Sequence, residues 1–274
     1  MKLAIKTYNQ SFPELQTTIP IQIGFPQLPE ADSASHFRVL RQWLKNCDDK
    51  HENLKCQPSK TGFLPTRLID VGHKGSEIVR LYETQKTDSF KYLALSHPWG
   101  KKPPWFCTFC SNVEQHKQGI KMADLTPTFK DAVKTTRELG HQYLWIDSIC
   151  IIQRDKSGAG DFEQESRRME HVFSSAYCVL AASSAEGQSD GFLNEREGSR
   201  RQFVTFKREG QHPFYVCNFI DDFNEHVLEG PLNKRGWVMQ ERVLAHRTIY
   251  FTNKQTYWEC GEGVRCETLT RMEK

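Results

Sequence analysis

Apolar residues fall in short uninterrupted runs along this chain, and polar or proline-containing stretches separate the runs. The clearest are residues 92–96 (YLALS), 143–147 (YLWID) and 177–182 (YCVLAA). Runs of this length, rich in branched and aromatic side chains, are typical of strands that are buried on both faces. Such strands belong to parallel sheets that helices cover. The pattern therefore predicts an α/β fold with a mostly parallel central sheet flanked by helices, in which these three runs are neighbours.

Helical periodicity appears between and around these runs. Residues 127–139 carry apolar side chains at helical spacing, with Thr126 before them as a good N-cap and Gly140 after them as a stop signal. This helix would join the runs at 92–96 and 143–147 into a β-α-β unit. Further helices are predicted at 33–47, 162–173 and 231–245.

The outer parts of the chain are less regular. Prolines between positions 13 and 29 predict an irregular, partly extended arm over residues 1–33, followed by the helix at 33–47. We therefore divide the chain into an N-terminal helical arm at 1–60 and a main domain at 61–274. Within that domain, the polar and basic residues 194–213 predict an insertion away from the core. Short strands are expected at 67–70, 78–82, 214–219, 247–251 and 255–259.

Composition excludes several classes of protein. A formal net charge of +3 is too small to argue for a nucleic-acid partner or a membrane surface. No apolar run approaches the roughly 18 residues of a membrane span, and the first residues contain no apolar stretch of a secretory signal. Nine scattered cysteines are an odd number, which favours free thiols in a reducing compartment. These features predict a cytoplasmic protein.

One short segment contains three residues of metal-ligating type. Cys47, His51 and Cys56 lie within ten positions, and the pair Cys107 and Cys110 would complete a zinc site. The alternative is a set of packed thiols. Because the spacing matches no common zinc finger, we expect no metal.

Polar side chains follow the predicted strands at their carboxyl ends. Ser96, His97, Trp99 and Gly100 follow the first run, and Asp147 closes the second. The carboxyl ends of parallel strands share one edge of a sheet, where ligands bind. Asp147 either lines a pocket at this edge or serves a structural role, as a cap or a buried acid. The loop after Trp99 is either a lid or a plain surface loop.

Seven blocks of sequence, taken in this order, resemble the fungal heterokaryon-incompatibility (HET) domain, and the resemblance extends over roughly residues 64 to 262. This sequence departs from the family pattern at Phe173, where Tyr is frequent, and in the two thiols of the loop at 101–111. The blocks are 92–100 (YLALSHPWG), 128–132 (TFKDA), 139–153 (LGHQYLWIDSICIIQ), 165–169 (ESRRM), 181–185 (AASSA), 235–244 (RGWVMQERVL) and 250–260 (YFTNKQTYWEC).

The resemblance implies a biological role and one candidate reaction. HET domains act in non-self recognition and programmed cell death in filamentous fungi. They are in turn distantly similar to TIR domains, some of which cleave NAD with a glutamate four residues after a tryptophan on a helix. Trp237 and Glu241 have that spacing here. The resemblance therefore implies a TIR- or flavodoxin-like core, a catalytic Glu241, and NAD as a substrate, with no bound cofactor.

The implied reaction needs few groups. Cleavage of the nicotinamide–ribose bond passes through an oxocarbenium-like transition state, which one carboxylate can stabilise because nicotinamide leaves as a neutral molecule. Trp99 and Trp237 would stack on flat rings of the substrate, although the alternative for Trp237, as a core residue, is favoured. Arg235 would bind a phosphate, and backbone N–H groups of the loop at 96–100 would face the pyrophosphate.

Other interpretations stay open. Glu241 is alternatively a structural acid, paired with Arg242 or Lys234. A thiol nucleophile, Cys150 with His97 as its base, is disfavoured because flanking isoleucines indicate burial, and buried thiols are inert. No glycine-rich dinucleotide or phosphate loop is present in the sequence. The alternative function is a non-catalytic signalling module that acts through self-association and partner binding.

Overall fold

The computed structural model describes residues 3–7, 21–23, 30–51, 56–57, 62–101, 103, 105–196, 203–207, 213–218, 221–234, 236–268 and 271–272. Its largest element is a ten-stranded sheet with the strand order β16-β15-β14-β13-β10-β5-β8-β3-β4-β7. In chain order these strands are β3 (Arg67–Asp70), β4 (Ile78–Glu83), β5 (Tyr92–Ser96), β7 (Ile120–Lys121), β8 (Tyr143–Trp145), β10 (Cys178–Ala181), β13 (Arg247–Phe251), β14 (Thr256–Cys260), β15 (Gly263–Cys266) and β16 (Arg271–Met272).

Helices connect and cover these strands. They are α1 (Ala34–Lys50), α2 (Val113–Gln118), α3 (Pro127–Glu138), α4 (Asp147–Cys150), α5 (Phe162–Ser166), α6 (Met169–Ser175) and α7 (Gly236–Leu244), with the short turns η2 (Met122–Asp124), η3 (Asn224–Leu228) and η4 (Leu232–Lys234). None of the helices in the described ranges combines the length and apolar character needed to cross a membrane.

The centre of the sheet follows the prediction from the apolar runs. Strand β5 pairs in parallel with β8 on one side and with β10 on the other, and β10 pairs in parallel with β13. The expectation of a mostly parallel sheet is wrong, however. Three antiparallel pairs flank this parallel centre on each side. Short connections such as those between β3 and β4 or between β13 and β14 can join antiparallel strands only.

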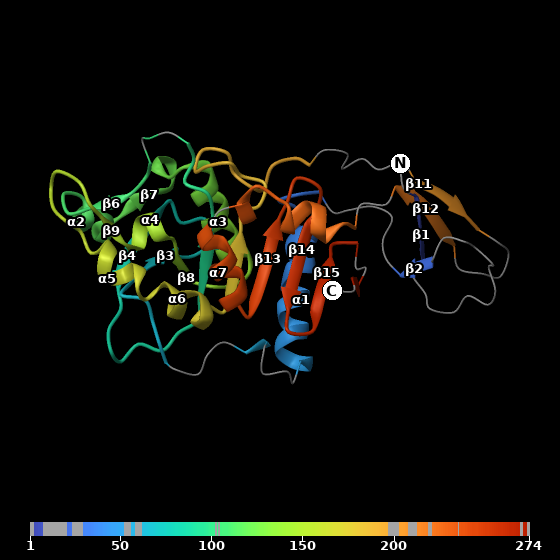
Figure 1. Ribbon diagram of the computed structural model, residues 1–274, viewed down its shortest axis with the longest axis horizontal. Coiled ribbons are helices and arrows are strands. Elements are labelled where there is room, and N and C mark those ends of the chain that lie inside the picture. Colours follow the sequence, from blue (N-terminus) through green and yellow to red (C-terminus); the bar gives the residue numbers. More distant parts are fainter. Residues whose placement is uncertain are drawn as a thin grey trace.

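Strand β14 shows how the two faces of the sheet are covered. Side chains alternate along a strand, so Thr256, Trp258 and Cys260 share one face. On this face Thr256 bonds to His36 of α1, and Trp258 packs on Trp43 of α1 at a ring distance of 6.4 Å. The opposite face of β14 packs beneath α7, and Figure 1 shows α7 in front of the sheet and α1 behind it.

Helices α1 and α3 lie side by side, because Arg41 donates to the carbonyl of Glu138. On the opposite face, α6 packs with Val172 and Phe173 over strands β5 and β8. The prediction of a single helix over 162–173 is wrong, because this segment forms two helices, α5 and α6. The cap of α1 is confirmed, since Ser33 Oγ accepts the N–H of His36 at 3.1 Å.

The N-terminal arm and the insertion together form a second sheet. Its strand order is β11-β12-β1-β2, with β1 (Leu3–Thr7), β2 (Ile21–Ile23), β11 (Phe203–Phe206) and β12 (Phe214–Asn218). Strands β1 and β2 are extended segments of the arm, which was predicted to be irregular and partly extended. Figure 1 shows this sheet at one end of the molecule. The division at residue 60 stays a prediction, although the buried side chains of α1 belong to the main core.

A third pairing is local. Strands β6 (Thr108–Phe109) and β9 (Ile152–Gln153) run parallel and bring the loop after β5 next to the segment after α4. Sequence analysis also missed β15 and β16, which extend the main sheet beyond β14.

Candidate functional site

The parallel strands create a point where the strand order reverses. The chain visits β5, β8, β10 and β13 in turn, whereas their order across the sheet is β8-β5-β10-β13. The connections after β5 and after β8 therefore leave in opposite directions, and α/β sheets commonly bind ligands at the carboxyl ends of the strands at such a reversal, here β5 and β10. Ser96 is the last residue of β5 and pairs with Ala181 of β10. This position is where a ligand site is expected in an α/β sheet.

Asp147 lies beyond the end of β8 and gathers donors from neighbouring segments. Its Oδ2 accepts the indole N–H of Trp99 at 2.7 Å, and its Oδ1 accepts the backbone N–H of Ser148 at 2.6 Å. The Nδ1 atom of His97 lies 3.8 Å from Oδ1. The structure therefore brings His97, Trp99 and Asp147 together, while their role in binding stays a prediction. Asp147 anchors the loop after β5 and also opens α4.

The loop after β5 is fastened to the loop after β10. Gly100 has φ +94°, and a Cβ added to Gly187 would lie 2.9 Å from the Cα of Gly100, so this close backbone approach requires glycine. Gln188 accepts the backbone N–H of Phe106 through its Oε1 at 2.7 Å. Trp105 packs edge-on against Trp99. In this arrangement the backbone of the loop is held in place over the strand ends.

Glu241 and Ser96 share a small cavity beneath α7. Pairing aligns Ser96 and Tyr250 on either side of Ala181, and Glu241 of α7 lies over this row of residues. The cavity has a volume of about 10 Å³, which is close to the space of one water molecule. Ser96 Oγ is buried and has no hydrogen-bond partner in the described part of the chain. Glu241 also lines a pocket of about 120 Å³ between α7 and α6.

The remaining candidates are partly outside the described residues. Arg235 lies outside them, as do the side chains of Lys234 and Trp237. The backbone of α7 includes both Trp237 and Glu241, so the two positions lie one turn apart as expected. The roles assigned to these residues stay predictions.

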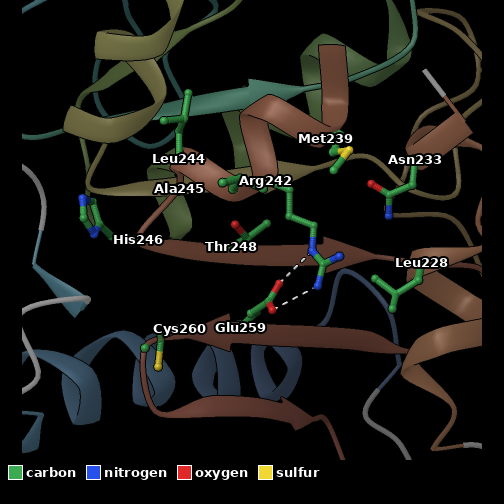
Figure 2. Close-up of a pocket in the computed structure, with 12 residues that line it drawn as sticks. Leu228, Asn233, Met239, Arg242, Leu244, Ala245, His246, Thr248, Glu259 and Cys260 are labelled. Atoms are coloured by element: carbon green, nitrogen blue, oxygen red, sulfur yellow. Dashed lines mark hydrogen bonds and ion pairs between the residues drawn. The ribbon is translucent and has the colours of Figure 1, made fainter. Parts of the chain in front are cut away.

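Sequence analysis missed a pocket with a volume of about 800 Å³ beside α7. Figure 2 shows Arg242 reaching from α7 to Glu259 of β14 inside it. The guanidinium donates to both oxygens of Glu259 at 3.1 Å, and the Tyr250 hydroxyl donates to the same carboxylate at 2.7 Å. Burial opposes the charge of Arg242, but Glu259 outweighs it and raises the Arg242 pKa. Arg242, one of the two alternative partners suggested for Glu241, pairs with Glu259.

The pocket and the small cavity share a wall. Asn233, Arg242 and Thr248 line both of them. No local motif would have revealed this site, because its residues come from α7, β13 and β14. Only the antiparallel pairing of β13 with β14, which places Tyr250 and Glu259 on one face, creates it.

The thiol nucleophile is disfavoured by its surroundings. Cys150 is 1 % exposed, and burial raises the pKa of its thiol to about 12. A thiol with that pKa carries almost no thiolate at neutral pH, and the thiolate is the reactive form. Cys150 therefore packs in the hydrophobic core.

Comparison with known protein families identifies the family of this chain. A family model described as heterokaryon incompatibility protein (HET) matches residues 92–241, which run from the start of β5 into α7. No curated protein and no solved structure matches the chain. The match covers more than half of the 274 residues, and it includes Ser96, Asp147 and Glu241. The chain belongs to the heterokaryon incompatibility (HET) family.

Proposed function

We propose that this protein is an effector of fungal non-self recognition and programmed cell death, and that it acts by hydrolysing the nicotinamide–ribose bond of NAD. The observation that carries the proposal is the cavity shared by Ser96 and Glu241. It places a carboxylate over the last residue of β5, next to the reversal of strand order. The HET family supplies the biological role, and this geometry supports the reaction.

The proposed chemistry uses one carboxylate and one water. The bond between the anomeric carbon and the pyridinium nitrogen breaks, and its electron pair leaves with nicotinamide. The Glu241 carboxylate stabilises the positive charge that develops on the ribose. Water then adds to the anomeric carbon and loses a proton, which gives ADP-ribose. Ser96 Oγ is placed to hold a ribose hydroxyl or this water.

The proposal requires that α7 moves before NAD can react. A cavity of about 10 Å³ cannot hold a nicotinamide ribose, whereas ligand pockets usually measure about 300–1,000 Å³. The neighbouring pocket of about 800 Å³ is large enough, and Arg242 is one of the three residues that line both this pocket and the cavity of Glu241. Release of Arg242 from Glu259 would join the two spaces. The described conformation is therefore a closed state, and activation would open it.

A single substitution tests the reaction. Glu241→Gln keeps the shape of the side chain but removes its negative charge, so we expect loss of nicotinamide release from NAD and loss of killing in a fungal host. The matched control is Glu170→Gln, because Glu170 lines the same pocket between α6 and α7 but does not line the cavity of Ser96. Killing by Glu241→Gln at the level of the parent chain would refute the catalytic role.

The alternative function is a signalling module without catalysis. It is favoured by one observation, namely that Met239 and Val243 lie one turn apart on α7 and are 69 % and 74 % exposed. Exposed apolar pairs of this kind can mediate self-association or partner binding. Host-cell death without any loss of NAD would support this function over the first.

A further inference from the structure

Four side chains of metal-ligating type meet where the N-terminal arm touches the main sheet. They are Cys47, His51, Cys56 and Cys260, and one ligand atom from each lies within 4.8 Å of all the others. His51 Nδ1 lies 3.5 Å from Cys56 Sγ and 3.6 Å from Cys260 Sγ. Sequence analysis had grouped the first three with Cys107 and Cys110. The structure supplies Cys260 in their place, and no other such group is found in the described ranges.

The fold explains why these residues meet. Cys47 lies in the last turn of α1, on the face that packs against β14, and His51 is the C-cap of the same helix. Cys56 follows five residues later. Cys260 ends β14 on the face turned to α1, and in Figure 2 its sulfur is directed away from Arg242 and toward the blue helix α1. Three ligands from one short segment therefore converge on one ligand from a distant strand.

The two nitrogen–sulfur distances in the cluster fit a tetrahedral metal site. With zinc–sulfur bonds of about 2.3 Å and zinc–nitrogen bonds of about 2.0–2.1 Å, a tetrahedron places sulfur about 3.6 Å from nitrogen and about 3.8 Å from a second sulfur. The two nitrogen–sulfur distances above agree with this geometry. Both sulfurs approach the same nitrogen, which a single S–H···N hydrogen bond does not explain.

We propose that Cys47, His51, Cys56 and Cys260 bind a zinc ion that fixes the N-terminal arm to the HET domain. Three thiolates and one imidazole are a common ligand set of structural zinc, and they suit hard cations such as magnesium or calcium poorly. The three cysteines are buried, with exposed fractions of 1 %, 0 % and 5 %, and His51 is partly buried. Four protein ligands leave no position for a substrate, so the site is structural.

The surroundings of the cluster also suit a bound metal. The buried Arg247 donates from Nε to the carbonyl of Cys56 at 2.9 Å and pairs with Asp48 at 2.7 Å. It thereby fixes both ends of the segment that carries the ligands. The backbone N–H of Gly261 donates to the sulfur of Cys56, and the backbone N–H of Glu262 donates to the sulfur of Cys260. Hydrogen bonds of this kind orient metal ligands and are typical of the second layer around a zinc ion.

Metal analysis of the purified full chain tests the proposal. The protein is prepared under reducing conditions without chelator, and zinc, iron and copper are measured by mass spectrometry. We expect about one zinc per chain. His51→Ala and Cys260→Ala should each lower the zinc content at least about tenfold, as expected for loss of a ligand from a closed site. The matched controls are Cys178→Ala, which removes a buried thiol elsewhere in the sheet, and Cys110→Ala, which removes an exposed one; both should keep the metal.

A second measurement keeps the test valid if a variant fails to fold. The parent chain is stripped with a chelator and titrated with cobalt(II), which should give the visible bands of a tetrahedral thiolate site with a stoichiometry of about one. Alkylation of the unreduced protein followed by peptide mass spectrometry separates free thiols from a disulfide. The proposal is overturned by a disulfide among the three cysteines, by a stoichiometric metal other than zinc, or by a parent chain that neither contains zinc nor binds cobalt.

Discussion

The buried carboxylate Glu267 offers a sharp test of how the two ends of the chain are joined. It is fully buried and accepts hydrogen bonds from Arg196, one of them at 2.8 Å, and lies 2.8 Å from His36 Nε2. Thr256 Oγ1 lies 3.0 Å from both His36 and Arg196. This network ties α1, the segment after β10 and the end of the sheet together.

The pKa of Glu267 sets the size of the expected effect. Burial raises it, but the charge of Arg196 and the hydrogen bond with His36 outweigh burial and hold the pKa at about 2. An unfolded glutamate has a pKa of about 4.3. Because the folded value is the lower one, the stabilisation is fully present above about pH 5 and is lost as the pH falls toward 2. A difference of about 2 pKa units corresponds to about 3 kcal/mol, of which about 2 kcal/mol is lost by pH 3.

The perturbation is Glu267→Gln, and the assay is urea unfolding followed by tryptophan fluorescence at pH 7 and pH 3. At pH 7 the variant should lose about 3–5 kcal/mol, because the charge of Arg196 stays buried without its counter-charge. Between pH 7 and pH 3 the parent chain should lose about 2 kcal/mol more than the variant. The other carboxylates titrate in both proteins, so the difference isolates Glu267. Equal losses in the two proteins would refute this account of the network.

Two further substitutions probe the packing around the site. Trp43→Ala removes a buried indole between α1 and β14 and should lower the free energy of unfolding by about 3–5 kcal/mol, measured by urea unfolding; a loss under about 1 kcal/mol would contradict the packing of α1 on the sheet. Trp99→Phe keeps an aromatic side chain but removes the indole N–H that donates to Asp147, so it should cost about 1.5–3 kcal/mol. Most of that cost should vanish in a background of Asp147→Ala, which removes the acceptor, if the hydrogen bond is its cause; a double-mutant cycle measures this coupling.

The centre of the fold could be predicted because its signals are local. Strands buried on both faces need continuous apolar runs, and those of β5, β8 and β10 are visible in the sequence. The edges of the sheet could not be predicted in the same way. Strands such as β7, β15 and β16 contain only two to four residues, and their direction depends on pairing partners far away in the chain. The apolar runs therefore predict a parallel sheet throughout, whereas only its centre is parallel and the whole sheet is mixed.

The same distinction applies to the sites. His97, Trp99 and Asp147 all follow strand ends, so one rule about parallel sheets brings them together. The partners of Arg242 and Cys56 follow from no such rule. Glu259 and Cys260 reach them only because β14 pairs with β13 and lies between α1 and α7. Local spacing alone predicts no zinc site at Cys47, His51 and Cys56, because the fourth ligand, Cys260, comes from a distant strand.

Strand β14 connects the two proposals physically. Glu259 and Cys260 are neighbours in the strand, so their side chains point to opposite faces of the sheet. Glu259 holds Arg242 of α7 on one face, and Cys260 meets Cys47 and His51 on the other. A zinc ion at Cys260 would fix the end of β14 against α1 and thereby fix the carboxylate that restrains α7. Opening of the pocket would then require release of Arg242 from a rigid strand, and the proposed closed state would be a stable resting state.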